Sequence, residues 1–205
     1  YVAGFPVPEV VQGINAFTLG MRAANPKAEV RVVWLNTWFD PSKERDAALA
    51  LVAQGADVLT NHSGSPAVPQ VAEEKGVRLV AYTSDMAAFA PKAQLAAVTH
   101  HWGALYTTMA REVLDGRWTA KAVWPGMKDG VVQLSAIDPA LPAPLKAELE
   151  RQRRALVAGQ VVPFAGRLVD NGGRVRQAAG RLADDAIARM DWFVEGVVGS
   201  VPAAR

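Results

Sequence analysis

The chain has 205 residues, half of them hydrophobic, a formal net charge of +2 and an isoelectric point of about 9.1. A chain of this size and apolar content buries a substantial core, in one large domain or two small ones, which excludes a disordered protein. No run reaches the roughly 18 apolar residues of a membrane span. The basic residues are scattered, which argues against a nucleic-acid partner. The sequence has no cysteine, which excludes disulfides and thiolate chemistry.

Short apolar runs alternate with helix-like stretches over the first 102 residues. The expected strands cover residues 1–5, 30–35, 58–60, 78–82 and 95–99, and the expected helices cover residues 9–25, 41–55 and 66–76. The second of these helices has Asp40 as its cap and Pro41 at its first position, where each residue type is favoured. Such alternation predicts βαβ units and a parallel sheet, with ligand-facing loops at the carboxyl ends of its strands.

The pattern changes after Trp102. We expect a helix over residues 105–114, an extended segment over 131–137, a charged helix over 144–158, an extended segment over 161–169 with a hairpin turn at 170–173, and a helical tail over 184–194. The sequence opens at Tyr1 inside an apparent strand, without a leader-like segment. We therefore expect the later part of a longer protein, in which the region beyond residue 100 completes a domain that begins before Tyr1.

The sequence lacks the common catalytic and nucleotide-binding motifs. It has no phosphate-binding loop, no Gly-x-Ser-x-Gly elbow and no His-Glu-x-x-His helix, and Pro6-Val7-Pro8 follows the first strand where a dinucleotide-binding domain has glycines. His100 and His101 are adjacent on an extended segment and point to opposite sides, so we expect neither a shared metal site nor a cofactor.

Aromatic and polar residues cluster after the expected strands instead. Trp38 and Phe39 follow the second strand, where an aromatic face could stack on a flat ligand such as a purine, although either ring could merely cover the end of the sheet. Trp34, inside the strand, is more simply a core residue. After the fifth strand, His101 or Trp102 could face a cleft where the chain leaves the repeating units.

Polar candidates follow the third and fourth strands. Asn61, His62, Ser63 and Ser65 offer directed donors and acceptors for a ligand ring, but Ser65 could equally cap the next helix. Asp85 could accept a ligand N–H or hydroxyl, or it could only stabilise a turn.

Five segments of the chain together carry a family resemblance. They are residues 1–17 from Tyr1-Val2-Ala3-Gly4-Phe5-Pro6 onward, Asn36-Thr37-Trp38-Phe39-Asp40-Pro41, Gln54-Gly55-Ala56-Asp57-Val58, Lys128-Asp129-Gly130 and Met190-Asp191-Trp192-Phe193-Val194-Glu195-Gly196. In this order they resemble segments of the basic membrane protein family of bacterial ABC-transporter substrate-binding proteins. The resemblance covers nearly the whole chain.

The resemblance implies the α/β fold of type I periplasmic binding proteins, in which two lobes joined by three crossing segments close on a ligand. It assigns residues 1–102 and 131–160 to the second lobe, a parallel-sheet lobe with helices on both faces. Residues 103–130 would be a crossover belonging to an incomplete first lobe, and residues 161–205 a further crossover and C-terminal segment. It also implies a purine ligand, an ABC permease as partner, a monomer, and a place in the periplasm or on the outer face of the cell membrane.

Two positions refine the implied ligand. By this resemblance, Trp38 falls at the position where nucleoside-binding members have an aromatic stacking residue. Thr83-Ser84-Asp85 falls on the Asp-Ser-Asp segment of those members. Thr83 lacks the charged bidentate acceptor that a ribose diol favours, so a free base such as adenine is expected. His62 replaces the small residue of many nucleoside binders, which favours a narrower and more polar pocket.

The resulting hypothesis is a solute-binding protein without catalysis. Trp38, Phe39, His62, Ser63, Ser65, Asp85, His101 and Trp102 would contact the ligand. The alternatives are the ligand-sensing domain of a two-lobed transcriptional regulator, since fold alone does not decide function, and a nucleoside hydrolase, for which only Asp40 and Asp85 are suitable acids. We also expect the isolated chain to fold poorly or to aggregate, because residues 131–169 would lack part of their partner lobe.

Overall fold

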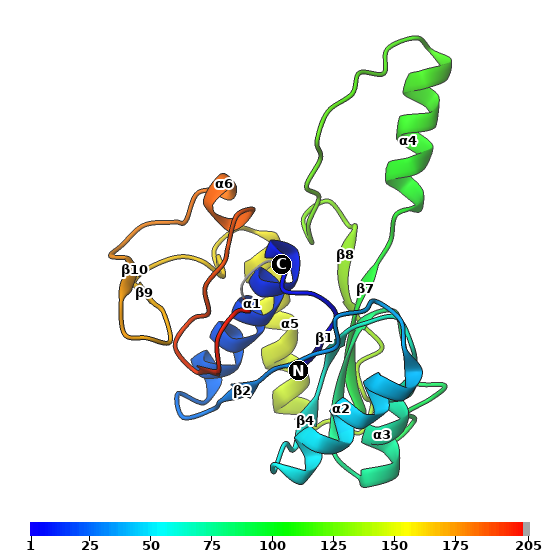
Figure 1. The fold of residues 1–205 in the computed structure, drawn as a ribbon. Helices are drawn as coiled ribbons and strands as arrows, with labels where there is room; N and C mark the ends of the chain where they lie inside the picture. The colour runs from blue at the N-terminus through cyan, green and yellow to red at the C-terminus, as the bar shows by residue number, and fades with distance from the viewer. Residues whose placement is uncertain (203–205) are drawn as a thin grey trace.

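The computed structural model describes residues 1–202 and shows a central, mostly parallel β-sheet with helices on both of its faces (Figure 1). Its strands are β1 (Val2–Ala3), β2 (Val30–Arg31), β3 (Val33–Trp34), β4 (Val58–Leu59), β5 (Asn61–His62), β6 (Arg78–Thr83), β7 (Gln94–His100), β8 (Val132–Ser135), β9 (Leu168–Val169), β10 (Val175–Gln177) and β11 (Val197–Val198). The helices are α1 (Pro8–Ala24), α2 (Pro41–Ala53), α3 (Ala67–Lys75), α4 (Gly103–Leu114), α5 (Ala143–Val157) and α6 (Asp184–Ile187).

Apart from β9 and β10, which pair with each other, the strands form three hydrogen-bonded groups that follow one another across one layer. β1 pairs in parallel with β3 on one side and with β5 on the other. Only Thr60 separates β4 from β5, and β4, β6 and β7 pair in parallel order. The sheet ends at β8, which is antiparallel to β7, and at β11, which pairs in parallel with β2. The parallel strands predicted from the first 102 residues are thus present, and β11 is a strand that the sequence pattern missed.

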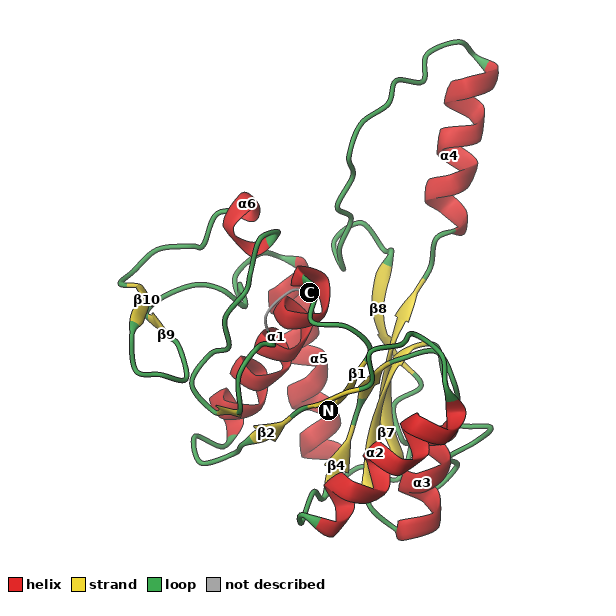
Figure 2. Cartoon of the chain, in the orientation of Figure 1, coloured by secondary structure: helices red, strands yellow, loops and turns green. Residues whose placement is uncertain are grey.

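Two hydrophobic clusters cover the two faces of the sheet. They lie under the helices that flank the sheet on its two sides (Figure 2). Val2 belongs to the cluster under α2 and α3, whereas its neighbours Tyr1 and Ala3 belong to the cluster under α1. This alternation is the period of a β-strand buried on both sides. It confirms helices on both faces of the sheet.

Helices α1 to α5 begin and end close to the residues that their sequences predict. The Asp40 side chain caps α2 by accepting a hydrogen bond from the Lys43 main-chain N–H at 3.1 Å, with Pro41 next to it. Gly76 ends α3 in the left-handed region at φ 67°, which a residue without Cβ adopts at little cost. Within residues 1–202, no helix is both long enough and apolar enough to cross a membrane.

Residues 103–130, named here the arm, project away from the sheet as α4 and a long return segment (Figure 1). None of the residues of α4 is buried. The arm leaves β7 after His100 and returns to β8 at Val132, and these two residues are paired across the two strands. The base of the arm is therefore fixed while its outer part contacts little of the described chain.

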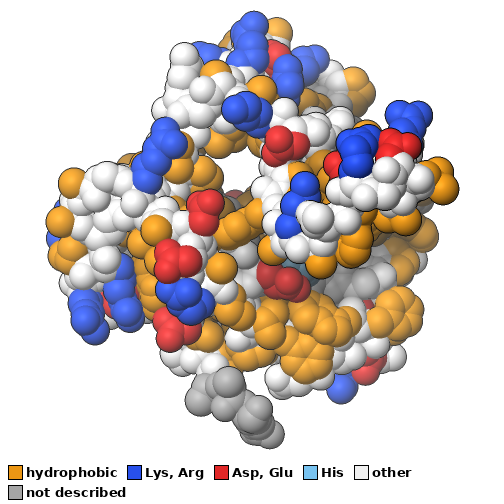
Figure 3. All heavy atoms as spheres, turned by 90° about the horizontal axis from the view of Figure 1, so that it is seen from above, with side chains coloured by type: hydrophobic (Ala, Val, Ile, Leu, Met, Phe, Trp, Pro, Cys, Tyr) orange, Lys and Arg blue, Asp and Glu red, His pale blue; other side chains and the backbone are white. Residues whose placement is uncertain are grey.

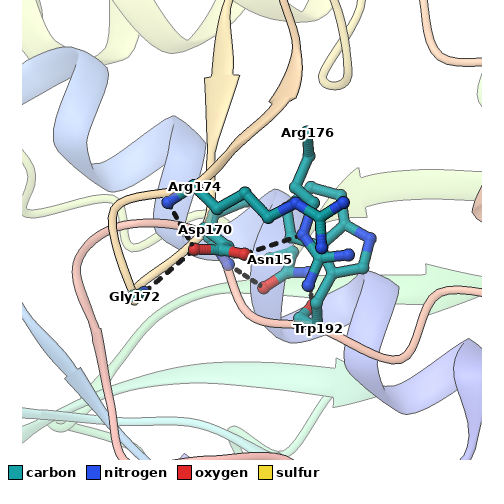
Figure 4. A network of polar contacts seen from close by, with 7 residues as sticks. Asn15, Asp170, Gly172, Arg174, Arg176 and Trp192 are labelled. Atoms are coloured by element: carbon teal, nitrogen blue, oxygen red, sulfur yellow. Dashed lines mark hydrogen bonds and ion pairs between the residues drawn. The ribbon is translucent and has the colours of Figure 1, made fainter.

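The tail differs from its prediction. Residues 184–194 were expected to be helical, but only α6 forms, and residues 190–194 instead lie against α1. The Asn15 side chain donates to the Trp192 carbonyl at 2.8 Å and accepts from the Val194 N–H at 3.0 Å (Figure 4). These bonds take main-chain groups that a helix would have used, which explains the extended course.

A hairpin at residues 168–177 covers the same tail. The predicted turn is present, with the Asp170 carboxylate accepting the N–H groups of Gly172 and Arg174 (Figure 4). The Arg176 guanidinium also donates to Asp170 at 2.7 Å and lies 5.2 Å from the centre of the Trp192 ring. The extended segment expected over residues 161–169 is shorter, because only β9 is a strand.

Candidate functional site

The carboxyl ends of the parallel strands carry a continuous series of aromatic rings, named here the aromatic row. Its members, in spatial order, are Phe5, Trp38, His62, Tyr82, His100, Trp102 and Tyr106. Consecutive ring centres are 4.7 to 5.9 Å apart, within the range of direct ring contacts. Seen from above, this end of the molecule shows hydrophobic side chains gathered beside acidic and histidine side chains (Figure 3).

Trp38 lies across the end of β1 because Gly4 leaves room for it. A Cβ added at Gly4 would come within 2.8 Å of the ring atom Cζ3 of Trp38, so a larger residue would displace the indole. The ring contacts Phe5 and His62 and is 42% exposed. Phe39 is 63% exposed and lies outside the aromatic row. An exposed indole on a fixed support offers a stacking surface to a flat ligand.

His62 occupies the centre of the aromatic row, at the end of β5. Its ring lies 5.8 Å from Trp38 and 4.7 Å from Tyr82, and its main-chain carbonyl accepts from the Gly4 N–H. Burial lowers the pKa of His62; the Glu9 carboxylate opposes this shift, and nearby His100 adds to it. The ring is therefore neutral near pH 7.

Ser63 and Ser65 are occupied by contacts within the protein. The Glu44 carboxylate of α2 is fully buried and accepts from the Ser63 hydroxyl at 2.7 Å, from the Ser65 N–H at 3.2 Å and from the Asp40 N–H at 3.2 Å. The Ser65 hydroxyl accepts from the Ala67 N–H at the start of α3, as a cap would. Glu44 thereby ties the loop that carries Trp38 to the loop that follows His62.

Asp85 lies apart from the aromatic row. Its carboxylate accepts from the Gln94 side chain at 2.8 Å and from the Ala87 N–H at 2.9 Å, and these two bonds lower its pKa. Gln94 begins β7, whereas the row meets that strand at its other end, His100. The contacts of Asp85 are those of a turn residue that closes the β6–β7 connection.

The structure separates His101 from Trp102. Trp102 stacks on Tyr106 at an interplanar angle of 12° and continues the aromatic row along α4. His101 faces away, with its Nε2 2.9 Å from the Thr99 hydroxyl, and lines an open hollow of about 480 Å³ between α4 and the return segment of the arm. A smaller hollow, about 280 Å³, lies at the opposite end of the strands beside Tyr1 and Gln54, where the aromatic row is absent.

The sequence interpretation did not include four members of the aromatic row among the ligand-binding residues: Phe5, Tyr82, His100 and Tyr106. Strand pairing brings two of them, Tyr82 and His100, to the same face of the sheet, because Tyr82 pairs with Val98 across β6 and β7. Residues two apart on a strand share a face, so His100 lies on the same side as Tyr82. Predicting the contact between Tyr82 and His100 required the register of β6 and β7, which the sequence alone does not reveal.

Comparison with known proteins identifies the family. The family model described as ABC transporter substrate-binding protein, PnrA-like, matches residues 1–164. The chain belongs to this Bmp family. It is 42% identical, over 98% of its length, to a purine-binding protein of Brucella abortus, of which the match covers 58%. It is 34% identical, again over 98% of its length, to a Haloferax volcanii protein named as ABC transporter glucose-binding protein TsgA13, covering 49% of that protein.

The fold also matches a solved structure. An ABC transporter solute-binding protein from Conexibacter woesei superposes with a TM-score of 0.62 over 78% of this chain and 55% of that one, at 21% identity, which shows the fold alone. The Bmp family and the type I binding-protein fold predicted from the sequence are confirmed. The chain spans about half the length of the curated relatives that it matches.

Proposed function

We propose that this chain forms the second lobe and crossover segments of a solute-binding protein that holds a purine base between two lobes and releases it to an ABC permease. The observation that carries the proposal is the aromatic row at the carboxyl ends of the parallel strands, where open α/β sheets bind ligands. The purine-binding relative from Brucella abortus supports the ligand class.

In this proposal the two lobes divide as the sequence predicts. Residues 1–102 and 131–160 supply the second lobe, the arm belongs to the first, and residues 161–205 supply a crossover and the C-terminal segment. Chain outside these 205 residues supplies the rest of the first lobe, in keeping with the relatives' greater length. Ligand contacts with both lobes favour the closed state, which the permease then recognises outside the cytoplasm, and no bond of the ligand is broken.

Within the second lobe, Trp38 stacks on the purine, with Phe39 beside it and His62 as a polar partner. Trp102 and His101 lie toward the hinge, where the chain enters the arm. Ser63 and Ser65 act through the Glu44 network that fixes both loops. Asp85 contributes only if closure frees its carboxylate from Gln94.

The preferred ligand is a free base, adenine in the first instance. The position that would need a charged acceptor for a ribose diol is Thr83, whose hydroxyl is uncharged. A sugar is the competing ligand, because one relative carries a glucose-binding name.

Calorimetric titration tests the proposal on the complete protein, freed of bound ligand by unfolding and refolding. Adenine, adenosine, guanosine, a pentose and glucose are compared. Tight binding of adenine with little gain from ribose is expected. Preference for nucleosides contradicts the free-base assignment alone, whereas preference for glucose, or no binding of any purine, contradicts the purine-binding function.

A further inference from the structure

His62 carries an unusual hydrogen-bonding deficit. Among residues 1–202, its Nδ1 is buried and has no hydrogen-bond partner. The ring itself is half-buried, so Nε2 is the nitrogen left on the accessible side. A polar atom shut off in this way is rare in folded proteins and calls for a functional explanation.

The deficit decides which nitrogen carries the proton. A buried N–H without an acceptor costs about 1–3 kcal/mol, and orphaned donors are rarer than under-satisfied acceptors. Nδ1 is therefore unprotonated, and the proton of the neutral ring is on Nε2. An imidazolium is disfavoured further, since it would place a second N–H, as well as a charge, at the buried position.

The groups around His62 agree with a neutral ring. Tyr82 of β6 and His100 of β7 face it from one side and Trp38 from the other, and none of them is negatively charged at neutral pH. Within residues 1–202, the carboxylate that acts on its pKa is that of Glu9, an exposed residue in the first turn of α1. The backbone of His62 pairs with β1, and its ring lies between the rings of Trp38 and Tyr82, which limit its movement.

We propose that His62 donates its Nε2–H to an unprotonated ring nitrogen of the planar ligand that lies against Trp38. This inference rests on the proposed purine-binding function and specifies what the site recognises. The ligand must present a bare aromatic nitrogen at the edge turned toward β5. A flat ring without such an acceptor would leave the Nε2–H unpaired and would be rejected, as buried donors generally reject ligands that cannot pair them.

The test compares adenine with its 1-, 3- and 7-deaza analogues, each of which replaces one ring nitrogen by C–H. On the complete protein, one analogue should bind about tenfold or more weakly than adenine. In His62→Phe that analogue and adenine should bind alike, while His62→Gln, whose amide carries a donor at a similar reach, should keep part of the difference. Phe89→Ala, which removes an exposed ring outside the aromatic row, is the control and should leave the difference intact.

Three outcomes overturn the inference: no analogue is weakened, the weakening persists in His62→Phe, or nitrogen NMR of the ligand-free protein finds the His62 proton on Nδ1. Failure of the proposed function is distinct, since the unmodified protein would then not bind adenine. The NMR assignment still tests the tautomer in that case.

Discussion

Trp38 is the residue on which the ligand proposal depends most directly. Its indole is exposed, supported by Gly4 and flanked by Phe5 and His62. Loss of one stacking ring costs about 1–3 kcal/mol, so Trp38→Ala should weaken adenine binding by about tenfold or more. Phe89→Ala, which removes an equally exposed aromatic ring outside the aromatic row, should leave the affinity unchanged. Equal affinities of the two variants would remove Trp38 from the site.

Thr83 should set the choice between base and nucleoside. It ends β6 at φ 70°, a left-handed conformation that β-branched residues rarely adopt and that aspartate tolerates better. Thr83→Asp should therefore be accepted by the backbone and should raise the affinity for adenosine relative to adenine by about tenfold, through a charged acceptor for the ribose diol. Ser84→Asp adds the same charge one residue later and is the calorimetric control. If the ratio of the affinities for adenosine and adenine is unchanged in Thr83→Asp, Thr83 does not determine ribose recognition.

The two histidines of the aromatic row should make stability depend on pH. Burial lowers the pKa of both His62 and His100 below 6.5 in the folded state. Below about pH 6.5 the unfolded chain then binds more protons than the folded one, so the free energy of unfolding falls as the pH falls. Denaturant titrations of the complete protein between about pH 7.5 and 5.5 should show this slope, and His62→Phe with His100→Phe should flatten it. A slope unchanged in the double variant would assign it to other groups.

At the scale of elements, α2 positions the site through a buried carboxylate. Glu44 accepts hydrogen bonds from both ligand-facing loops, and Glu44→Ala would leave those donors unpaired in the interior. Each such donor costs about 1–3 kcal/mol, so the variant should lose about 2–5 kcal/mol of stability and bind adenine more weakly. Glu74→Ala, which removes an exposed carboxylate paired with Arg45, should change stability by less than about 1 kcal/mol. Urea denaturation measures the free energy of unfolding of both variants. A loss in Glu44→Ala no larger than that in Glu74→Ala would show that the buried carboxylate is not needed for stability.

The elements also show how far the sequence determined the fold. Caps, prolines and apolar spacing correctly predicted α1 to α5 because these signals act within a few residues. The predicted tail helix failed because Asn15, far away in sequence, binds the main chain at residues 192 and 194. Loop aromatics such as Trp38 stand out in the sequence, but Tyr82 and His100 join the site only through strand register. Long-range pairing is the information that local patterns lack.

At the scale of the whole molecule, the arm carries several large apolar side chains that no other part of the described chain covers. Tyr106, Leu114 and Trp124 are 60%, 85% and 57% exposed. The sequence expectation placed the missing contacts in residues 131–169, but β8 pairs with β7, and Phe164 and Leu168 are buried. The expectation differs from the structure because β7 (residues 94–100) already supplies the hydrogen-bonding partner of β8.

The isolated 205-residue chain should therefore self-associate through the arm and bind a hydrophobic dye, because large apolar side chains gathered on an exposed segment favour association. Since His100 and Val132 are paired neighbours on β7 and β8, an Asn-Gly turn can replace the arm and close a tight hairpin. Sedimentation and dye fluorescence should show the intact chain associated and the shortened chain monomeric, with a cooperative melt. Equal association of the two chains would place the exposed surface elsewhere, and a monomeric intact chain with low dye binding would show that the arm is stable without a partner.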